Sequence, residues 1–349
     1  MLGTLRFILA YFVFLSHFPE SGLKLNLGFV SVIIFYFISG YLMMKSYHRF
    51  QLHVSKPIRS FYLDRCIKIF PQYLIVLLLT VVFFSWLGVS TEETYKGVSF
   101  DTYKIIFDAF LLPVNLAVGG IGDLFPKLGG VSIVPPAWSL SVEFHFYLLV
   151  PLLVVLPHRM LIATVLVSAA LLTFSFFTKS VYFDTLHFGY RYIFPMLVVF
   201  IYGMMFSSSL PQHRQIAFAI WAYFCGLLTI ILPGLPSWYH FAVQEITFGI
   251  VIALPVFHYA MNLKIDYSWF KAIDQWLGDL SYPVFLSHYL AIYLAQHLFG
   301  VSSFAKIYFF AASVAILLII SSFLALLQRY IDAKRINVRG FNSMRSTSV

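Results

Sequence analysis

The chain has 349 residues, of which 60% are hydrophobic, 19% are aromatic and only 11% are charged. Soluble domains are typically about 45–50% apolar and about 25% charged, so the composition excludes an ordinary soluble protein and indicates an integral membrane protein of several spans. No folded basic domain carries the net charge of +9, so no nucleic-acid partner is expected. Cys66 and Cys225 are isolated from each other and from His pairs, which predicts neither a disulfide framework nor a metal site.

Ten stretches are long and apolar enough to be predicted as membrane spans, since about twenty apolar residues cross the hydrocarbon core as a helix. We therefore predict an all-α integral membrane protein with about ten transmembrane helices. The predicted spans are residues 2–18, 27–46, 68–88, 138–156, 160–177, 190–207, 215–232, 241–261, 275–298 and 304–328.

One long region, residues 88–136, separates the third and fourth predicted spans. Within it, residues 104–118 are apolar but too short and too interrupted to cross a membrane. We predict that this stretch forms an additional short re-entrant or surface helix. Loops of this length in compact proteins are more often functional than idle, so the region is expected to contribute to function.

The excess positive charge lies in two segments, residues 45–68 with a net charge of +5 and residues 329–349 with +4. Lys and Arg near the ends of spans accumulate on the cytoplasmic side, so both segments are predicted to face the cytoplasm. An even number of spans then places both termini there. Residues 1–330 are expected to form a single transmembrane domain, followed by a short basic cytoplasmic tail at residues 331–349.

Two ionisable residues in the first predicted span, Arg6 and His17, are eleven positions apart. At 100° per residue this spacing returns to within about 20° of the same direction, so both are predicted on one helix face, roughly 16 Å apart along the axis. Arg6 would lie near the cytoplasmic end and His17 near the outer end. An interfacial Arg that extends to the headgroups and an unrelated His would give the same spacing.

Glu143 lies five residues after Trp138 in the stretch PAWSLSVEFHFYLLVPLL. A lone carboxylate at that depth costs about 2.5 kcal/mol or more, so it is expected to face the interior of the helix bundle. Ser139 and Tyr147 share its face at positions i−4 and i+4. A His oriented by a carboxylate is a general-base arrangement, and His17 and Glu143 both fall in the outer half of the membrane. A structural Glu bonded to neighbouring helices is the alternative.

Arg65 and Lys68 lie one helical turn apart at the start of the third predicted span. Pairs of cations bind phosphates well, although ordinary positive-inside residues would show the same pattern. This pair suggests a phosphate-bearing ligand that is held on the cytoplasmic side, with chemistry further out.

Five elements occur in chain order: Arg6 with His17, IFYFISGYLMM (34–44), Arg65 with KIFP, PAWSLSVEFHFYLLVPLL (136–153) and LGDLSYPVFLSHYLAIY (277–293). Together they resemble the acyltransferase-3 family, multispan membrane enzymes that O-acylate bacterial cell-surface polysaccharides and other carbohydrates. Lys68 departs from the family pattern, which has a second Arg there, and a Lys lacks the bidentate guanidinium fork.

The resemblance implies transfer of an acyl group from a cytoplasmic acyl-CoA co-substrate, usually acetyl-CoA, to a hydroxyl of a free or lipid-linked carbohydrate. The protein would lie in the bacterial inner membrane, present the acceptor at the extracytoplasmic face and need no metal. Arg6, Arg65 and Lys68 would hold the phosphates of CoA. His17 would take the proton of the acceptor hydroxyl or accept the acyl group itself, and Glu143 would hold or charge-stabilise it.

Five further residues are candidate substrate-binding groups: Ser139, Tyr147, Arg191, Tyr282 and His288. Ser139, Tyr147 and Tyr282 are candidate oxyanion donors, whereas His288 matches the late family histidine and would have a second polar role or pack. Arg191, at the outer start of a span, would either recognise an anionic acceptor or cap the interface. The acceptor, the acyl chain and the oligomeric state stay open.

An alternative function is a transporter or flippase of a lipid-linked sugar or acyl group, with His17 and Glu143 as a proton relay. Inverted repeats would favour a transporter, and the two halves of the chain show no convincing internal repeat. A structural subunit of an envelope complex would not need ionisable groups at depth. The sequence therefore favours an acyltransferase.

Overall fold

The computed structural model describes residues 1–18, 25–87, 100–118, 132–178, 182–231, 242–263, 267–299 and 306–338, together with Ser180 and Pro233. Throughout these residues the secondary structure is helical, without a strand, which confirms the all-α class. The ten longer helices are α1 (Leu2–Leu15), α2 (Leu27–His53), α3 (Pro57–Leu87), α6 (Ala137–Val155), α7 (His158–Phe177), α8 (Ile193–Ser207), α9 (Pro211–Gly226), α10 (Val243–Asn262), α11 (Ser268–Phe299) and α12 (Lys306–Val338). The shorter ones are α4 (Thr102–Ala109), α5 (Val114–Val118) and two π-helical turns, η2 (Thr185–Gly189) and η3 (Leu227–Ile231).

Each predicted span overlaps one of these longer helices. Among the described residues, six helices are long and apolar enough to cross a membrane, namely α2, α3, α6, α7, α10 and α12, and α1 and α8 are shorter apolar helices. The protein is therefore a multi-pass membrane protein, while the count of ten spans stays a prediction. Helix α9 falls outside the six because it has only 16 residues. Helix α11 falls outside because Ser, Tyr, His and Gln residues interrupt its apolar part and lower its mean hydropathy.

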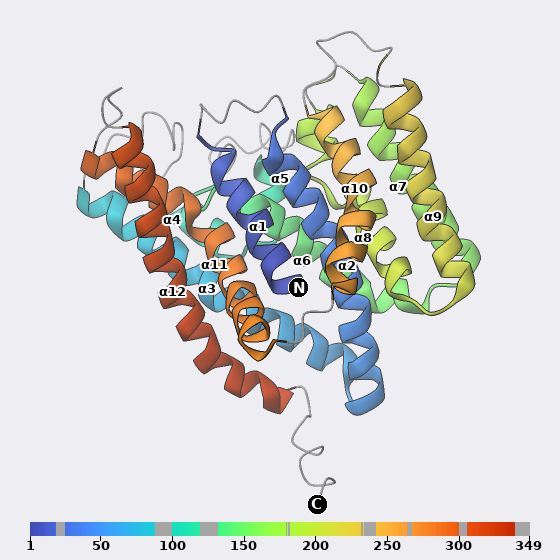
Figure 1. Ribbon diagram of the computed structural model, residues 1–349, viewed down its shortest axis with the longest axis horizontal. Helices are drawn as coiled ribbons and strands as arrows, with labels where there is room; N and C mark the ends of the chain where they lie inside the picture. The colour runs from blue at the N-terminus through green and yellow to red at the C-terminus, as the bar shows by residue number, and fades with distance from the viewer. Residues whose placement is uncertain are drawn as a thin grey trace, which may run out of the picture.

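Several helices extend beyond the predicted spans because hydropathy detects only the part of a helix that suits the hydrocarbon core. Helix α2 continues to His53 and α3 begins at Pro57, so the basic segment between the second and third spans is mostly helical. Helix α12 likewise continues to Val338, past the end of the predicted membrane domain at residue 330. Figure 1 shows the ends of α2 and α12 in the lower part of the view, with α5 in its upper half.

Helix α2 lies at the centre of the bundle. It contacts α1, α3, α6, α8 and α10. In its most apolar stretch of 18 residues, 78% of the residues are buried, against 28% in the corresponding stretch of α12. A Cβ on Gly40 would lie 2.0 Å from the carbonyl oxygen of Phe200, and one on Gly203 would lie 1.9 Å from that of Phe37. Small residues at helix crossings let backbones approach closely in membranes, so these two glycines set the contact between α2 and α8.

Helix α1 crosses the start of α11 in the same manner. A Cβ on Gly3 would lie 1.8 Å from the carbonyl oxygen of Asp274, and one on Gly278 would lie 3.0 Å from the Cα of Gly3. The Asp274 carboxylate accepts hydrogen bonds from the backbone N–H and the hydroxyl of Thr4, at 2.8 and 2.7 Å. This contact holds the first turn of α1 against α11.

The region between α3 and α6 contains two short helices where the sequence predicts one. Asp101 caps α4, since its carboxylate accepts a hydrogen bond from the backbone N–H of Lys104 at 2.8 Å. Leu111 adopts a left-handed conformation with φ +61°, and Pro113 follows it. These two residues end α4 and begin α5, because an L-residue at positive φ cannot continue a right-handed helix.

Candidate functional site

A cavity of about 300 Å³ lies inside the bundle, between α1, α2, α3, α6 and α11. Seven of the ten residues singled out from the sequence line it, although they come from four helices. These seven are Arg6 on α1, Arg65 and Lys68 on α3, Ser139, Glu143 and Tyr147 on α6, and Tyr282 on α11. Glu143, which the sequence predicts in the outer half with His17, therefore lines the same cavity as Arg6, Arg65 and Lys68, which are predicted on the cytoplasmic side.

Three cations and one carboxylate line the cavity: Arg6, Arg65, Lys68 and Glu143. Arg65 is largely buried, forms an ion pair with Asp64 and leans over the ring of Tyr147 at 5.9 Å. The buried Nε of Arg65 has no hydrogen-bond partner among the described residues. A buried donor left unsatisfied costs about 1–3 kcal/mol, so a bound anion would remove that cost.

The carboxylate of Glu143 accepts a hydrogen bond from a residue of its own helix. The hydroxyl of Tyr147 donates a hydrogen bond to Oε1 of Glu143 at 2.5 Å, and the hydroxyl of Ser39 lies 3.5 Å from that of Tyr147. Arg6 interacts electrostatically with Glu143. The predicted sharing of one helix face by Glu143 and Tyr147 thus produces a direct contact.

The three candidate oxyanion donors all line the cavity but are hydrogen-bonded within the protein. The hydroxyl of Tyr147 donates to Glu143, that of Tyr282 to the carbonyl oxygen of Ile69 at 3.1 Å, and that of Ser139 to the carbonyl oxygen of Pro136 at 2.9 Å. An oxyanion would have to displace one of these acceptors.

His17 lies outside the cavity lining, in the exposed turn that follows the end of α1 at Leu15. Its Nδ1 lies 3.1 Å from the hydroxyl of Tyr289, and its ring stacks on that of His288 with 5.1 Å between centroids. No hydrogen bond joins His17 to Glu143 within the part of the chain that the structure describes. The two residues that the sequence pairs therefore have separate partners.

Helix α11 connects the cavity with His17. Phe285 lines the cavity, and its ring centroid lies 5.8 Å from that of Phe35, which also lines it. His288 follows about 4.5 Å further along the helix axis and is fully buried, with its Nδ1–H donating to the carbonyl oxygen of Phe285 at 2.6 Å. Phe285 thus lines the cavity and also contacts His288, whose ring stacks on that of His17.

Arg191 lies apart from the cavity, at the junction of α5, α6 and α8. Its guanidinium donates to the carbonyl oxygen of Val118 at 2.9 Å and lies 5.7 Å from the ring of Trp138. The side-chain amide of Asn115 donates to the carbonyl oxygen of Arg191 at 3.0 Å. Arg191 therefore ties the end of α5 to the entrance of α8.

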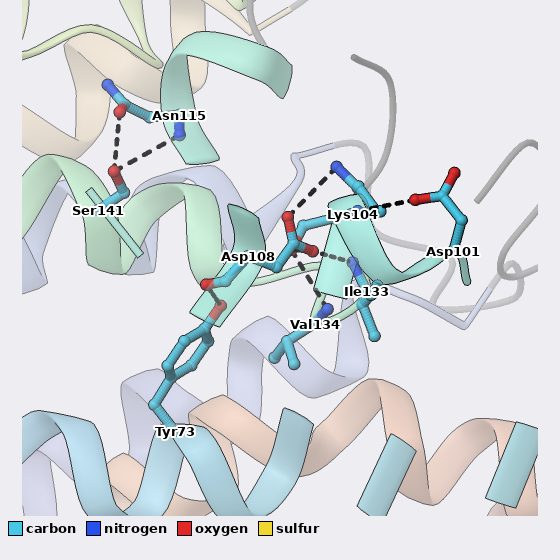
Figure 2. Close-up of polar contacts among 9 residues, drawn as sticks. Tyr73, Asp101, Lys104, Asp108, Asn115, Ile133, Val134 and Ser141 are labelled. Carbon is cyan, nitrogen blue, oxygen red and sulfur yellow. Dashed lines mark hydrogen bonds and ion pairs between the residues drawn. The ribbon is translucent and has the colours of Figure 1, made fainter. Parts of the chain in front are cut away.

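A buried polar network that the sequence reading missed holds α4 in place (Figure 2). Nζ of Lys104 lies 3.3 Å from Oδ1 of Asp108, whose other oxygen accepts hydrogen bonds from the hydroxyl of Ser132 at 2.9 Å and the N–H of Ile133 at 2.7 Å. The hydroxyl of Tyr73 on α3 donates to the carbonyl oxygen of Asp108 at 2.6 Å. The spacing of four between Lys104 and Asp108 is the sequence signal that indicates such a pair.

Two opposing effects act on the carboxyl of Asp108, which lies outside the predicted spans. Burial raises its pKa above the ordinary value, and the charge of Lys104 together with the hydrogen bonds from Ile133 and Ser132 opposes that rise. Figure 2 also shows the neighbouring contact of α5 with α6, in which the hydroxyl of Ser141 donates to Oδ1 of Asn115 at 2.7 Å. Together these contacts fix both short helices to the bundle.

The acyltransferase-3 family model, described as an acyltransferase domain, matches residues 2–326. The chain belongs to this family, which confirms the resemblance noted in the sequence. Over 170 residues it is 26% identical to an uncharacterized protein of Aquifex aeolicus (strain VF5), covering 47% of this chain and 72% of that protein. Over 289 residues it is 22% identical to the peptidoglycan O-acetyltransferase OatA of Listeria monocytogenes serovar 1/2a, covering 76% of this chain and 45% of that protein.

The chain thus spans less than half of the Listeria relative's length. No solved structure matches the chain significantly. Family membership together with the apolar helices defines a multi-pass membrane acyltransferase.

Proposed function

We propose that the protein transfers an acyl group, foremost acetyl, from cytoplasmic acyl-CoA to a hydroxyl of a carbohydrate at the extracytoplasmic face of the inner membrane. The observation that carries the proposal is the cavity in which Arg6, Arg65, Lys68 and Glu143 meet, within a chain of an acyltransferase family. The peptidoglycan O-acetyltransferase activity of the Listeria relative supports acetyl as the group and a cell-envelope carbohydrate, free or lipid-linked, as the acceptor.

The cations of the cavity suit the phosphates of CoA. Charge-assisted hydrogen bonds from Arg and Lys to phosphate are among the strongest in proteins, and Arg65 has an unsatisfied Nε to offer. Small-molecule sites have volumes of about 300–1,000 Å³, so a cavity of about 300 Å³ accommodates part of acyl-CoA rather than the whole molecule. Arg65 and Lys68 belong to the basic segment at residues 45–68, which favours the cytoplasm as the side from which the donor enters.

His17 supplies the chemistry in this proposal. As a general base, its imidazole takes the proton of the acceptor hydroxyl while the oxygen bonds to the thioester carbon. The C–S bond then breaks, and the proton passes from His17 to the sulfur of CoA. As a nucleophile, the imidazole would instead take the acyl group first, release CoA and pass the group to the hydroxyl in a second step.

The thioester of the donor must extend beyond the cavity to reach His17, which lies outside the cavity lining. The apolar walls between the cavity and His17 would exclude water and limit hydrolysis of the thioester. Glu143 balances the charge of Arg6 at the cavity, so any stabilisation of a His17 cation acts at a distance rather than by contact. The transporter alternative draws no support from a direct bond between His17 and Glu143, because the described residues contain none.

The proposal is tested with purified protein in nanodiscs, radiolabelled acetyl-CoA and a cell-envelope polysaccharide extract. Label should move to carbohydrate with release of CoA, and His17→Ala should abolish the transfer. His297→Ala, which removes an exposed His at the end of α11, is the matched control and should retain full activity. Absence of turnover with acetyl-CoA and with longer acyl-CoA donors would contradict the proposal and favour a transporter.

A further inference from the structure

We propose that Tyr289 is a positioning residue that selects Nε2 of His17 as the reactive nitrogen of the site. This inference rests on the proposed role of His17 as base or nucleophile. It assigns to a tyrosine of α11 the orienting role that the sequence pattern gives to Glu143.

The surroundings of His17 carry this inference. The turn after α1 leaves the imidazole exposed, and two consecutive residues of α11 hold it. The hydroxyl of Tyr289 lies 3.1 Å from Nδ1 of His17, with 4.5 Å between the two ring centroids. His288 stacks on the imidazole with an interplanar angle of 16°. One hydrogen bond and one stacked ring thus define both the plane and the rotation of the His17 side chain.

His288 is itself a rigid support. Its side chain is fully buried, and the bond from its Nδ1–H to the carbonyl oxygen of Phe285 fixes its ring. Because His288 and Tyr289 are adjacent on α11, they hold the imidazole of His17 from the same helix. Glu143 cannot share this task in the described geometry, since its carboxylate lines the cavity and accepts the hydroxyl of Tyr147.

The chemical consequence follows from the two nitrogens of a neutral imidazole, of which one carries the proton and the other a lone pair. The hydrogen bond made by one nitrogen sets which of them is free to react. The hydroxyl of Tyr289 can either donate to Nδ1 or accept from it, and we assign Nδ1–H of His17 as the donor and the oxygen of Tyr289 as the acceptor. The lone pair then lies on Nε2, which no described residue engages. Nε2 then takes the proton of the acceptor hydroxyl, and the bond to Tyr289 strengthens as the ring becomes cationic.

The decisive variant is Tyr289→Phe, which keeps the ring contact and removes only the hydroxyl. We expect kcat for acyl transfer to fall by about 10- to 100-fold, part of the 10²–10⁴-fold that general-base catalysis supplies. The KM for acyl-CoA should change by less than about twofold, because Tyr289 does not line the cavity.

Tyr223→Phe is the matched control, because it removes a hydroxyl that contacts Thr173 at 2.7 Å on the exposed surface of α7 and α9. It should leave kcat unchanged. Wild-type kcat in Tyr289→Phe or a rise in KM alone would each overturn the positioning role.

A readout that needs no turnover separates this inference from the proposed function. Protein labelled with ¹⁵N-histidine, compared with its His17→Ala variant, identifies the signal of His17 in an NMR spectrum. We expect Nδ1 to be the protonated nitrogen in the wild type and this preference to weaken in Tyr289→Phe. An unchanged tautomer in that variant would overturn the inference, whereas absence of acyl transfer in the wild type would count against the proposed function.

Discussion

At the scale of single residues, Lys68 is the most informative cation of the cavity, because it stands where the family pattern has an Arg. Lys68→Gln should raise the KM for acyl-CoA about tenfold with little change in kcat, as expected when one charge-assisted contact to a bound ligand is lost. Lys68→Arg should restore or improve the KM, since an Arg offers a bidentate fork. Steady-state kinetics at constant ionic strength measure both effects.

Lys45→Gln is the matched control for this prediction. Lys45 lies on α2 outside the cavity lining, with its ammonium 2.5 Å from the hydroxyl of Tyr41. A rise in KM as large in Lys45→Gln as in Lys68→Gln would point to the overall charge of the protein and contradict a specific donor contact.

The sequence indicates several of the cavity residues because an ionisable side chain in an apolar span is energetically costly and therefore usually functional. Arg6, Arg65 and Glu143 are recognisable on that ground, and all three line the cavity. Tyr289 gives no such signal in a chain with 22 tyrosines. Its contact with His17 joins residues 272 positions apart, so only the packing of α1 on α11 reveals it.

At the scale of elements, the ion pair of Lys104 and Asp108 fixes α4. Asp108→Asn keeps the volume but removes the carboxylate that forms the ion pair with the buried ammonium of Lys104, which should lower the free energy of unfolding by about 3–5 kcal/mol. Combining it with Lys104→Met should recover part of the loss, because removing both charges also removes the desolvation penalty. Thermal unfolding in nanodiscs measures the change, and equal stability of wild type and Asp108→Asn would contradict the structural role.

The crossing of α2 and α8 predicts a large effect from a small substitution. Gly40→Ala places a methyl group where Phe200 has its carbonyl oxygen, so the helices must separate, at a cost of about 1–3 kcal/mol or more. Gly226→Ala on α9 is the matched control, since a Cβ there meets no atom within 4 Å, and it should be neutral or slightly stabilising. Equal midpoints of thermal unfolding for the two variants would contradict the close crossing.

The contact of α1 with α11 should depend on pH through Asp274, which precedes the predicted span. Partial burial alone would raise the pKa of its carboxyl, but the hydrogen bonds from Thr4, the charge of the N-terminus and the hydrogen bond from Gly3 together outweigh it and lower the pKa below the ordinary 3.8. A lowered pKa stabilises the fold above the ordinary value, and the contribution is lost as the pH falls through the folded-state value. Unfolding midpoints between pH 6 and pH 3 should therefore decline less steeply in Asp274→Asn, whereas identical slopes would contradict this assignment.

The fold class and the position of each long helix follow from hydropathy, because the core of a membrane demands apolar helices. Helix ends do not follow from it. The extension of α2 to His53 consists of polar residues that form a helix outside the hydrocarbon core. The division into α4 and α5 depends on the left-handed backbone conformation of Leu111. Hydropathy is insensitive to both.

At the scale of the whole molecule, donor binding and acceptor binding would take place at different positions along the bundle. The cavity with its cations would take the donor from the cytoplasmic end, and His17, supported by α11, would serve an acceptor at the outer end. The exposed position of His17 is consistent with an acceptor that binds from the outer side. The cavity inside the bundle is consistent with a donor that enters from the cytoplasmic side.

The most direct test of this account is transfer across a sealed membrane. Proteoliposomes with the protein in one orientation would receive labelled acetyl-CoA on the side of the basic segments and carbohydrate acceptor only on the other side. The account predicts label on the carbohydrate across the membrane, and none with His17→Ala. Transfer that occurs only when donor and acceptor share one side would contradict it.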